Sequence, residues 1–156
     1  TIAEYDGELA KWKKHARYTT TMAQHFVEEV HEWFRVNFQQ LSDMLNKQQT
    51  SSDDAPVVLT DKILEGFRWR LRQLEGHHKR EDHAFFPSMR RSVPSSAKDF
   101  DVLEEDHTKL YPLEHMVFDA ALPMEERVAA LREFIVFLED HLRREEMIVV
   151  PIILKV

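Results

Sequence analysis

Two stretches of the sequence repeat one pattern of ligand-type side chains, H-x-[KR]-R-E-[DE]-x4-P. The first begins at His77 and contains Glu81, and the second begins at His141 and contains Glu145. A histidine and a glutamate four residues apart lie on one helix face, about one turn apart. In both stretches this face also carries the apolar residues of the helix. Because a carboxylate in a protein interior is costly unless it is paired, the repeat indicates a bound cation.

Two more histidines occur in a second shared pattern, E-E-x-H followed three residues later by an apolar residue. Counting along the expected helices places both at the same height as the histidines of the repeat. We therefore predict a dinuclear metal site in which two glutamates bridge the ions and each helical hairpin supplies the histidines of one ion. The predicted metal ligands are His31 and His77 for one ion, His107 and His141 for the other, and Glu81 and Glu145 as bridges.

The composition restricts the chemistry of this site. The chain has 156 residues, nine histidines and no cysteine, so disulfides, thiolate nucleophiles and cysteine-bound metals are excluded. Nitrogen and oxygen ligands without sulfur suit iron, manganese or zinc better than copper(I). A net charge of -7 argues against nucleic acid as a partner, because phosphate binding needs a basic face. The apolar runs are too short to span a membrane, and we expect a cytoplasmic location.

Other candidate ligands remain as alternatives. His25 lies nearly two turns from the expected ligand layer and is the second choice on its helix. Tyr111 could be a phenolate ligand, a hydrogen-bond donor to bound peroxide, or a packing residue. We expect His78, His83 and His115 to be in solvent or to support a ligand from outside the site.

Several acidic side chains near the expected ligands have a simpler interpretation. Glu28 and Glu104 each lie one turn before a proposed ligand and could hold an imidazole N–H, but a solvated helix face is the favoured reading. The acidic and basic side chains of residues 143–146 are expected to form surface ion pairs.

The elements that position these residues are expected to be helices. Apolar residues recur every three to four positions almost throughout, and only three glycines and six prolines occur. We predict an all-α fold, an antiparallel up-down four-helix bundle with a short extra N-terminal helix, in a single domain spanning 1–156. A polar loop is expected at 48–59 and a kink at Pro112. The predicted helices span residues 2–17, 22–47, 61–91, 96–121 and 123–154.

The paired H-x3-E motifs, with single histidines on the alternate helices, resemble those of the hemerythrin-like, or HHE cation-binding, family over about residues 21–154. The resemblance implies a non-haem di-iron centre in a four-helix bundle. Its two iron ions would be bridged by carboxylates and, as an open alternative, by an oxo group. Oxygen carriers of this family have a further histidine where this chain has Tyr111, and a bridging aspartate where it has Glu146. These departures argue against reversible oxygen carriage.

The sequence therefore predicts a di-iron protein that binds dioxygen or a reduced oxygen species such as peroxide, in oxygen or iron sensing or storage. The alternative is a di-iron enzyme that removes peroxide in a catalase-like reaction or oxidises ferrous iron. A regulatory module whose folding reports iron, and a helical bundle without metal, are two further hypotheses.

Overall fold

The computed structural model describes residues 1–50 and 55–155, and this part of the chain is helical without any β-strand. The predicted loop at 48–59 falls partly outside the described residues. Two short π-helical segments, η1 and η2, precede α2 and α4, and a 3-10 turn, η3, precedes α5. The helical elements are α1 (Ile2–Lys13), η1 (His25–His31), α2 (Glu32–Thr50), α3 (Asp61–Arg80), η2 (Glu81–Phe85), α4 (Phe86–Ser92), η3 (Pro94–Ser96), α5 (Ala97–Phe118) and α6 (Met124–Lys155).

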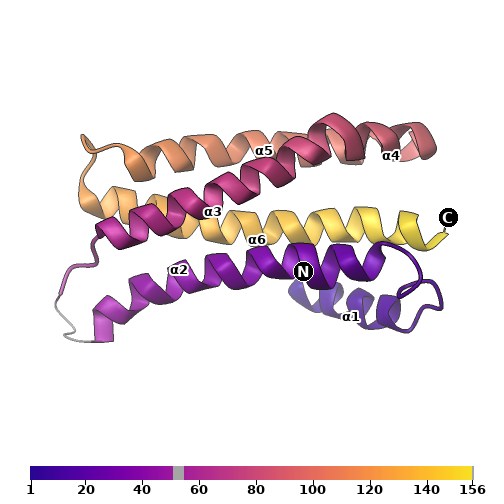
Figure 1. Cartoon of the computed structure of the whole chain (residues 1–156), viewed down its shortest axis with the longest axis horizontal. Coiled ribbons are helices and arrows are strands. Elements are labelled where there is room, and N and C mark those ends of the chain that lie inside the picture. The colour runs from indigo at the N-terminus through magenta and orange to yellow at the C-terminus, as the bar shows by residue number, and fades with distance from the viewer. Residues whose placement is uncertain (51–54, 156) are drawn as a thin grey trace.

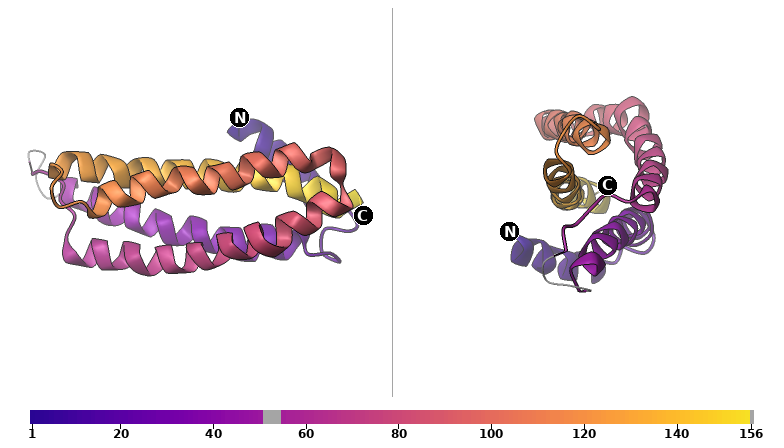
Figure 2. Two further views of the ribbon diagram at one scale, coloured as in Figure 1. Left: turned by 90° about the horizontal axis from the view of Figure 1, so that it is seen from above. Right: turned by 90° about the vertical axis from the view of Figure 1, so that its left-hand side faces the viewer.

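The long helices lie alongside one another as rods (Figure 1). One rod joins η1 to α2, a second joins α3 to η2 and α4, and α5 and α6 form the others. Successive rods run in opposite directions, as the view from above also shows (Figure 2). Helix α1 packs against α6 near the end of the rods where the chain terminates. No described helix is both long and apolar enough to cross a membrane.

Two apolar clusters fill the space between the rods. One is built around Phe38, Phe67 and Phe134, and the other around Phe26 and Phe100. On each rod, the buried histidines and glutamates fall between the residues of one cluster and those of the other. The polar residues therefore form a layer with apolar side chains on both sides, which keeps bulk water away from them.

Several helix ends differ from the sequence prediction. The first helix ends at Lys13 rather than at 17, because the following residues form turns that bond to the helix end. The second rod begins with a π segment at His25 and extends to Thr50, rather than spanning 22–47. Helix α5 runs through Pro112 and ends at Phe118 rather than at 121, because the backbone of the next residue, Asp119, is extended. Such shifts of a few residues are the usual uncertainty of helix boundaries.

Candidate metal centre

Two groups of buried ligand-type side chains meet in the polar layer. Within each group, one ligand atom per residue lies within 4.8 Å of the others. Glu81 belongs to both groups, so the two candidate sites adjoin. We call them site 1, formed by His31, His77, Glu81 and Glu145, and site 2, formed by His78, Glu81, His107 and His141.

The carboxylate of Glu81 has the orientation of a bridge. Its Oε1 lies 2.7 Å from Nε2 of His77 in site 1, and its Oε2 lies 3.3 Å from Nε2 of His107 in site 2. Glu145 also faces both sites, because its Oε2 is 3.4 Å from Nε2 of His31 and 3.7 Å from Nε2 of His141. The arrangement can therefore place one carboxylate oxygen of Glu81 on each of two adjacent cations.

Most of these ligand atoms have no hydrogen-bond partner. Within the described chain, the buried side-chain atoms left unpaired are Nε2 of three histidines and both oxygens of two glutamates. These residues are His31, His77, His78, Glu81 and Glu145. A buried polar atom without a partner costs about 1–3 kcal/mol, and folded proteins rarely contain many. A cation would satisfy all of them together, so the residues present fit a metal centre.

Burial and the neighbouring charges shift the pKa values of the site residues. Burial, together with the nearby charge of Glu145, raises the pKa of Glu81 to about 8. Burial would also raise the pKa of Glu145, but His31, His141 and His77 together lower it to about 2. In turn, burial opposes the protonation of His31, but Glu145 and Glu146 raise its pKa to about 9. Burial lowers the pKa of His77 to about 4. A cation bound here would favour the deprotonated forms of these groups, because metal ligands bind without their protons.

Three outer carboxylates orient the imidazoles of the sites. His31 donates from Nδ1 to Glu146 at 2.8 Å, and His107 donates from Nδ1 to Asp82 at 2.8 Å. His141 is held in the same way by Asp106, at 3.3 Å. A hydrogen bond at Nδ1 fixes the ring and leaves Nε2 free to bind a metal. Each of these contacts joins two different rods, so the orientation of the ligands depends on the packed fold.

Glu146 is also the centre of a buried network at one end of site 1. Arg35 donates to both of its carboxylate oxygens, at 2.9 and 2.8 Å, and the hydroxyl of Tyr5 in α1 donates to one of them. The prediction of surface ion pairs over residues 143–146 is therefore wrong for Glu146, which is fully buried. Glu145 is also fully buried, as its predicted role as a ligand requires. The sequence prediction missed the burial of Glu146 because it did not foresee that α1 would cover this part of α6.

His78 is the largest correction to the predicted site. It is buried rather than in solvent, and its ring stacks on that of His107 with centroids 3.7 Å apart. Consecutive residues on a helix point about 100° apart. Because α3 lies between two neighbouring rods, His77 faces the rod that carries His31, and His78 faces α5. The sequence prediction admitted only one inward-facing residue per turn and so left His78 outside.

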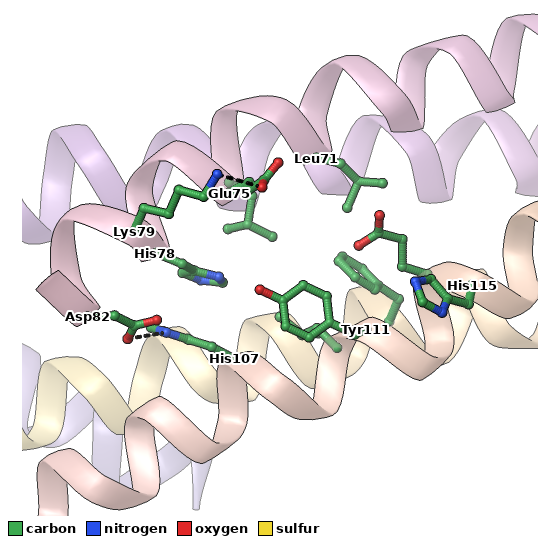
Figure 3. Close-up of a pocket in the computed structure, with 12 residues that line it drawn as sticks. Leu71, Glu75, His78, Lys79, Asp82, His107, Tyr111 and His115 are labelled. Atoms are coloured by element: carbon green, nitrogen blue, oxygen red, sulfur yellow. Dashed lines mark hydrogen bonds and ion pairs between the residues drawn. The ribbon is translucent and has the colours of Figure 1, made fainter.

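The two alternative ligands lie outside both sites. His25 is exposed and pairs with Glu29 at 2.8 Å. Tyr111 is 52% exposed and lines a pocket between α3 and α5, next to site 2 (Figure 3).

The outer glutamates considered from the sequence do not contact an imidazole. Glu28 accepts from Tyr18 at 3.2 Å, and Glu104 accepts from Arg90 at 2.8 Å. The imidazole N–H groups are held instead by carboxylates next to the ligands in the sequence.

Comparison with known proteins gives one family. The sequence matches the hemerythrin HHE cation-binding domain over residues 22–153. No curated protein and no solved structure matches the chain. The family match spans the rods and includes every residue of sites 1 and 2. The chain therefore belongs to the hemerythrin HHE cation-binding domain family.

Proposed function

We propose that this chain is a non-haem di-iron protein that binds dioxygen or a reduced oxygen species, in oxygen or iron sensing or storage. The observation that carries the proposal is the set of unpaired, buried nitrogen and oxygen atoms that converge on two adjoining sites. Membership of a cation-binding family supports the same reading. We further propose that the alternating rods form the antiparallel up-down four-helix bundle expected from the sequence.

The proposed ligands comprise the set predicted from the sequence and His78. In site 1, His31 and His77 would hold one ion together with the two glutamates. In site 2, three histidines and Glu81 would hold the other. Glu81 would bridge the ions, and Glu145 would bind the ion of site 1 and face that of site 2. Coordination positions beyond these side chains would be open to a small ligand.

Iron is the proposed metal for a chemical reason as well as the family resemblance. The donors are imidazole nitrogens and carboxylate oxygens, without sulfur, and this set suits iron, manganese or zinc. Carboxylate sites in helical bundles hold iron or manganese, whereas zinc has no redox chemistry, and the family resemblance favours iron. Zinc and manganese are the alternatives that metal analysis must distinguish.

An enzyme is the second candidate, and the pocket beside site 2 favours it. The pocket is lined by His78 and His107, so it would give small molecules access to site 2. Such access would allow peroxide disproportionation, in which two molecules of hydrogen peroxide give two of water and one of dioxygen. It would equally allow ferrous iron to reach the site as a substrate for oxidation.

The test of the proposed function compares two metal-loaded forms of the protein. The full chain is loaded anaerobically with ferrous iron or with zinc, and dioxygen or hydrogen peroxide is then added. We expect the iron form to develop new visible absorption with either oxidant, and the zinc form to show none, because zinc has no redox chemistry.

Evolution of dioxygen from peroxide over many turnovers would favour the enzyme, whereas stoichiometric spectral change without turnover would favour sensing or storage. An iron form whose spectrum responds to neither oxidant would contradict the proposed function.

A further inference from the structure

The pocket between α3 and α5 leads to an unpaired ligand atom of site 2 (Figure 3). Its volume is about 210 Å³, and its lining includes His78 and His107. His78 is 8% exposed, and its Nε2 has no hydrogen-bond partner. Since a water molecule occupies roughly 30 Å³, the pocket has room for a partly hydrated ion. The pocket therefore extends to two residues of site 2, His78 and His107.

The charges that line this pocket are mostly negative. Lys79 is the one lysine or arginine among the lining residues, against the acidic Glu75, Asp82 and Glu114. Lys79 is paired with Glu75 at 2.8 Å, as Figure 3 shows, and Asp82 accepts the hydrogen bond of His107. Glu114 is partly buried and makes no hydrogen bond or ion pair within the described chain. The pocket thus contains a carboxylate that forms no ion pair with a lysine or arginine of the described chain.

We propose that this pocket is the route by which a divalent cation reaches the metal centre, with Glu75 and Glu114 attracting the ion and His78 as the first ligand it meets. The inference rests on the proposed function, because it assumes that the two sites hold metal. A concave surface lined by one sign of charge raises the local concentration of the opposite ion and its rate of association. The same charges disfavour small anions and do not attract neutral molecules.

A pocket on another side of the protein has a more balanced charge, with three basic and four acidic side chains in its lining. It lies beside α1 and is lined by Lys13, Arg35 and Arg143 as well as by acidic residues, and it contains no residue of sites 1 and 2. Within the polar layer, His31 and Glu145 are fully buried and do not line the pocket between α3 and α5. An ion that enters through the pocket between α3 and α5 therefore meets site 2 before site 1.

The test measures how fast the metal-free full chain takes up Co²⁺, whose bound form is detected by its absorption in stopped flow. The double variant Glu75→Gln, Glu114→Gln removes two negative charges from the pocket. The double variant Glu65→Gln, Glu133→Gln removes two exposed ones elsewhere and is the matched control. At low salt we expect the pocket variant to bind Co²⁺ about three- to tenfold more slowly than the control. The difference should shrink at high salt, where screening is strong.

The final amount of bound Co²⁺ should be the same in both variants, because neither change touches sites 1 and 2. A steric variant, Leu71→Trp, gives a second measurement without a charge change, since Leu71 lines the pocket. It should also slow uptake at an unchanged final content. The proposed route would be overturned if the charge variant took up Co²⁺ as fast as its control. It would also be overturned if the steric variant took up Co²⁺ as fast as the wild type. Failure of the wild-type protein to bind Co²⁺, Fe²⁺ or Zn²⁺ would instead remove the metal centre itself.

Discussion

Replacing Glu81 with methionine is expected to reduce the metal content from two ions per chain to one or none. Glu81 is the one residue shared by sites 1 and 2, and each of its oxygens faces a histidine of a different site. Loss of this carboxylate removes an anionic ligand from both ions at once. The measurement is elemental analysis of the anaerobically iron-loaded variant after free metal has been removed by dialysis.

The same substitution is expected to act in the opposite direction on the metal-free protein. Glu81 is then a buried carboxyl group whose oxygens have no hydrogen-bond partner. A buried polar atom without a hydrogen bond costs about 1–3 kcal/mol, and an apolar side chain of similar size removes this cost. The metal-free variant should therefore unfold at or above the temperature at which the metal-free wild type unfolds. Added metal should no longer raise the unfolding temperature of the variant.

The matched control for this substitution is Glu65→Met, on the exposed side of α3, which belongs to the same rod. It should keep both ions and the full stabilisation by metal. Two ions retained in the Glu81 variant would contradict the bridging role. A metal-free variant far less stable than the wild type would show that Glu81 has a structural partner in the fold.

Replacing His78 with alanine is expected to weaken one metal position and spare the other. His78 belongs to site 2 and not to site 1. Even the loss of a group that only supports a metal ligand typically costs about 10–100-fold in affinity. We therefore expect at least this loss for the weaker ion, with one ion per chain remaining after dialysis. Titration of the metal-free protein with Co²⁺ or Fe²⁺ measures both affinities.

The control for His78 is His83→Ala, which removes an exposed histidine from the following π segment. This variant should bind both ions as the wild type does. Equal metal affinities of the two alanine variants would show that His78 is a packing residue. His78 would then lie outside the ligand set, as expected from the sequence.

The rods were predictable because their signal is long and periodic. Apolar residues at helical spacing recur over the whole of α3 and α6, and Thr60 caps α3 as its residue type indicates. The π segments were not predictable, because they add a residue to a turn without a distinctive composition. Segment η2 begins at Glu81, at the metal centre, and such segments are common at functional sites.

The predicted ligands came from a repeated motif, and the structure places them together. What sequence reasoning missed depends on which rods are neighbours. His78 faces inward only because α5 lies on that side of α3. The same is true of the outer carboxylates, each of which holds a histidine of another rod.

These carboxylates share a pattern that a single sequence does not reveal. Asp82 follows Glu81, Asp106 precedes His107, and Glu146 follows Glu145, so each is the immediate sequence neighbour of a proposed ligand. Each then reaches across to orient an imidazole elsewhere. One-dimensional spacing identifies residues on the same face of a helix, but it does not pair side chains between helices.

The most direct test of this account is the anomalous scattering of crystals of the iron-loaded protein, measured on both sides of the iron absorption edge. We predict two iron peaks per chain. One should lie among His31, His77, Glu81 and Glu145, and the other among His78, Glu81, His107 and His141. A single peak, no peak, or iron bound away from Glu81 in the fully loaded protein would contradict the dinuclear centre.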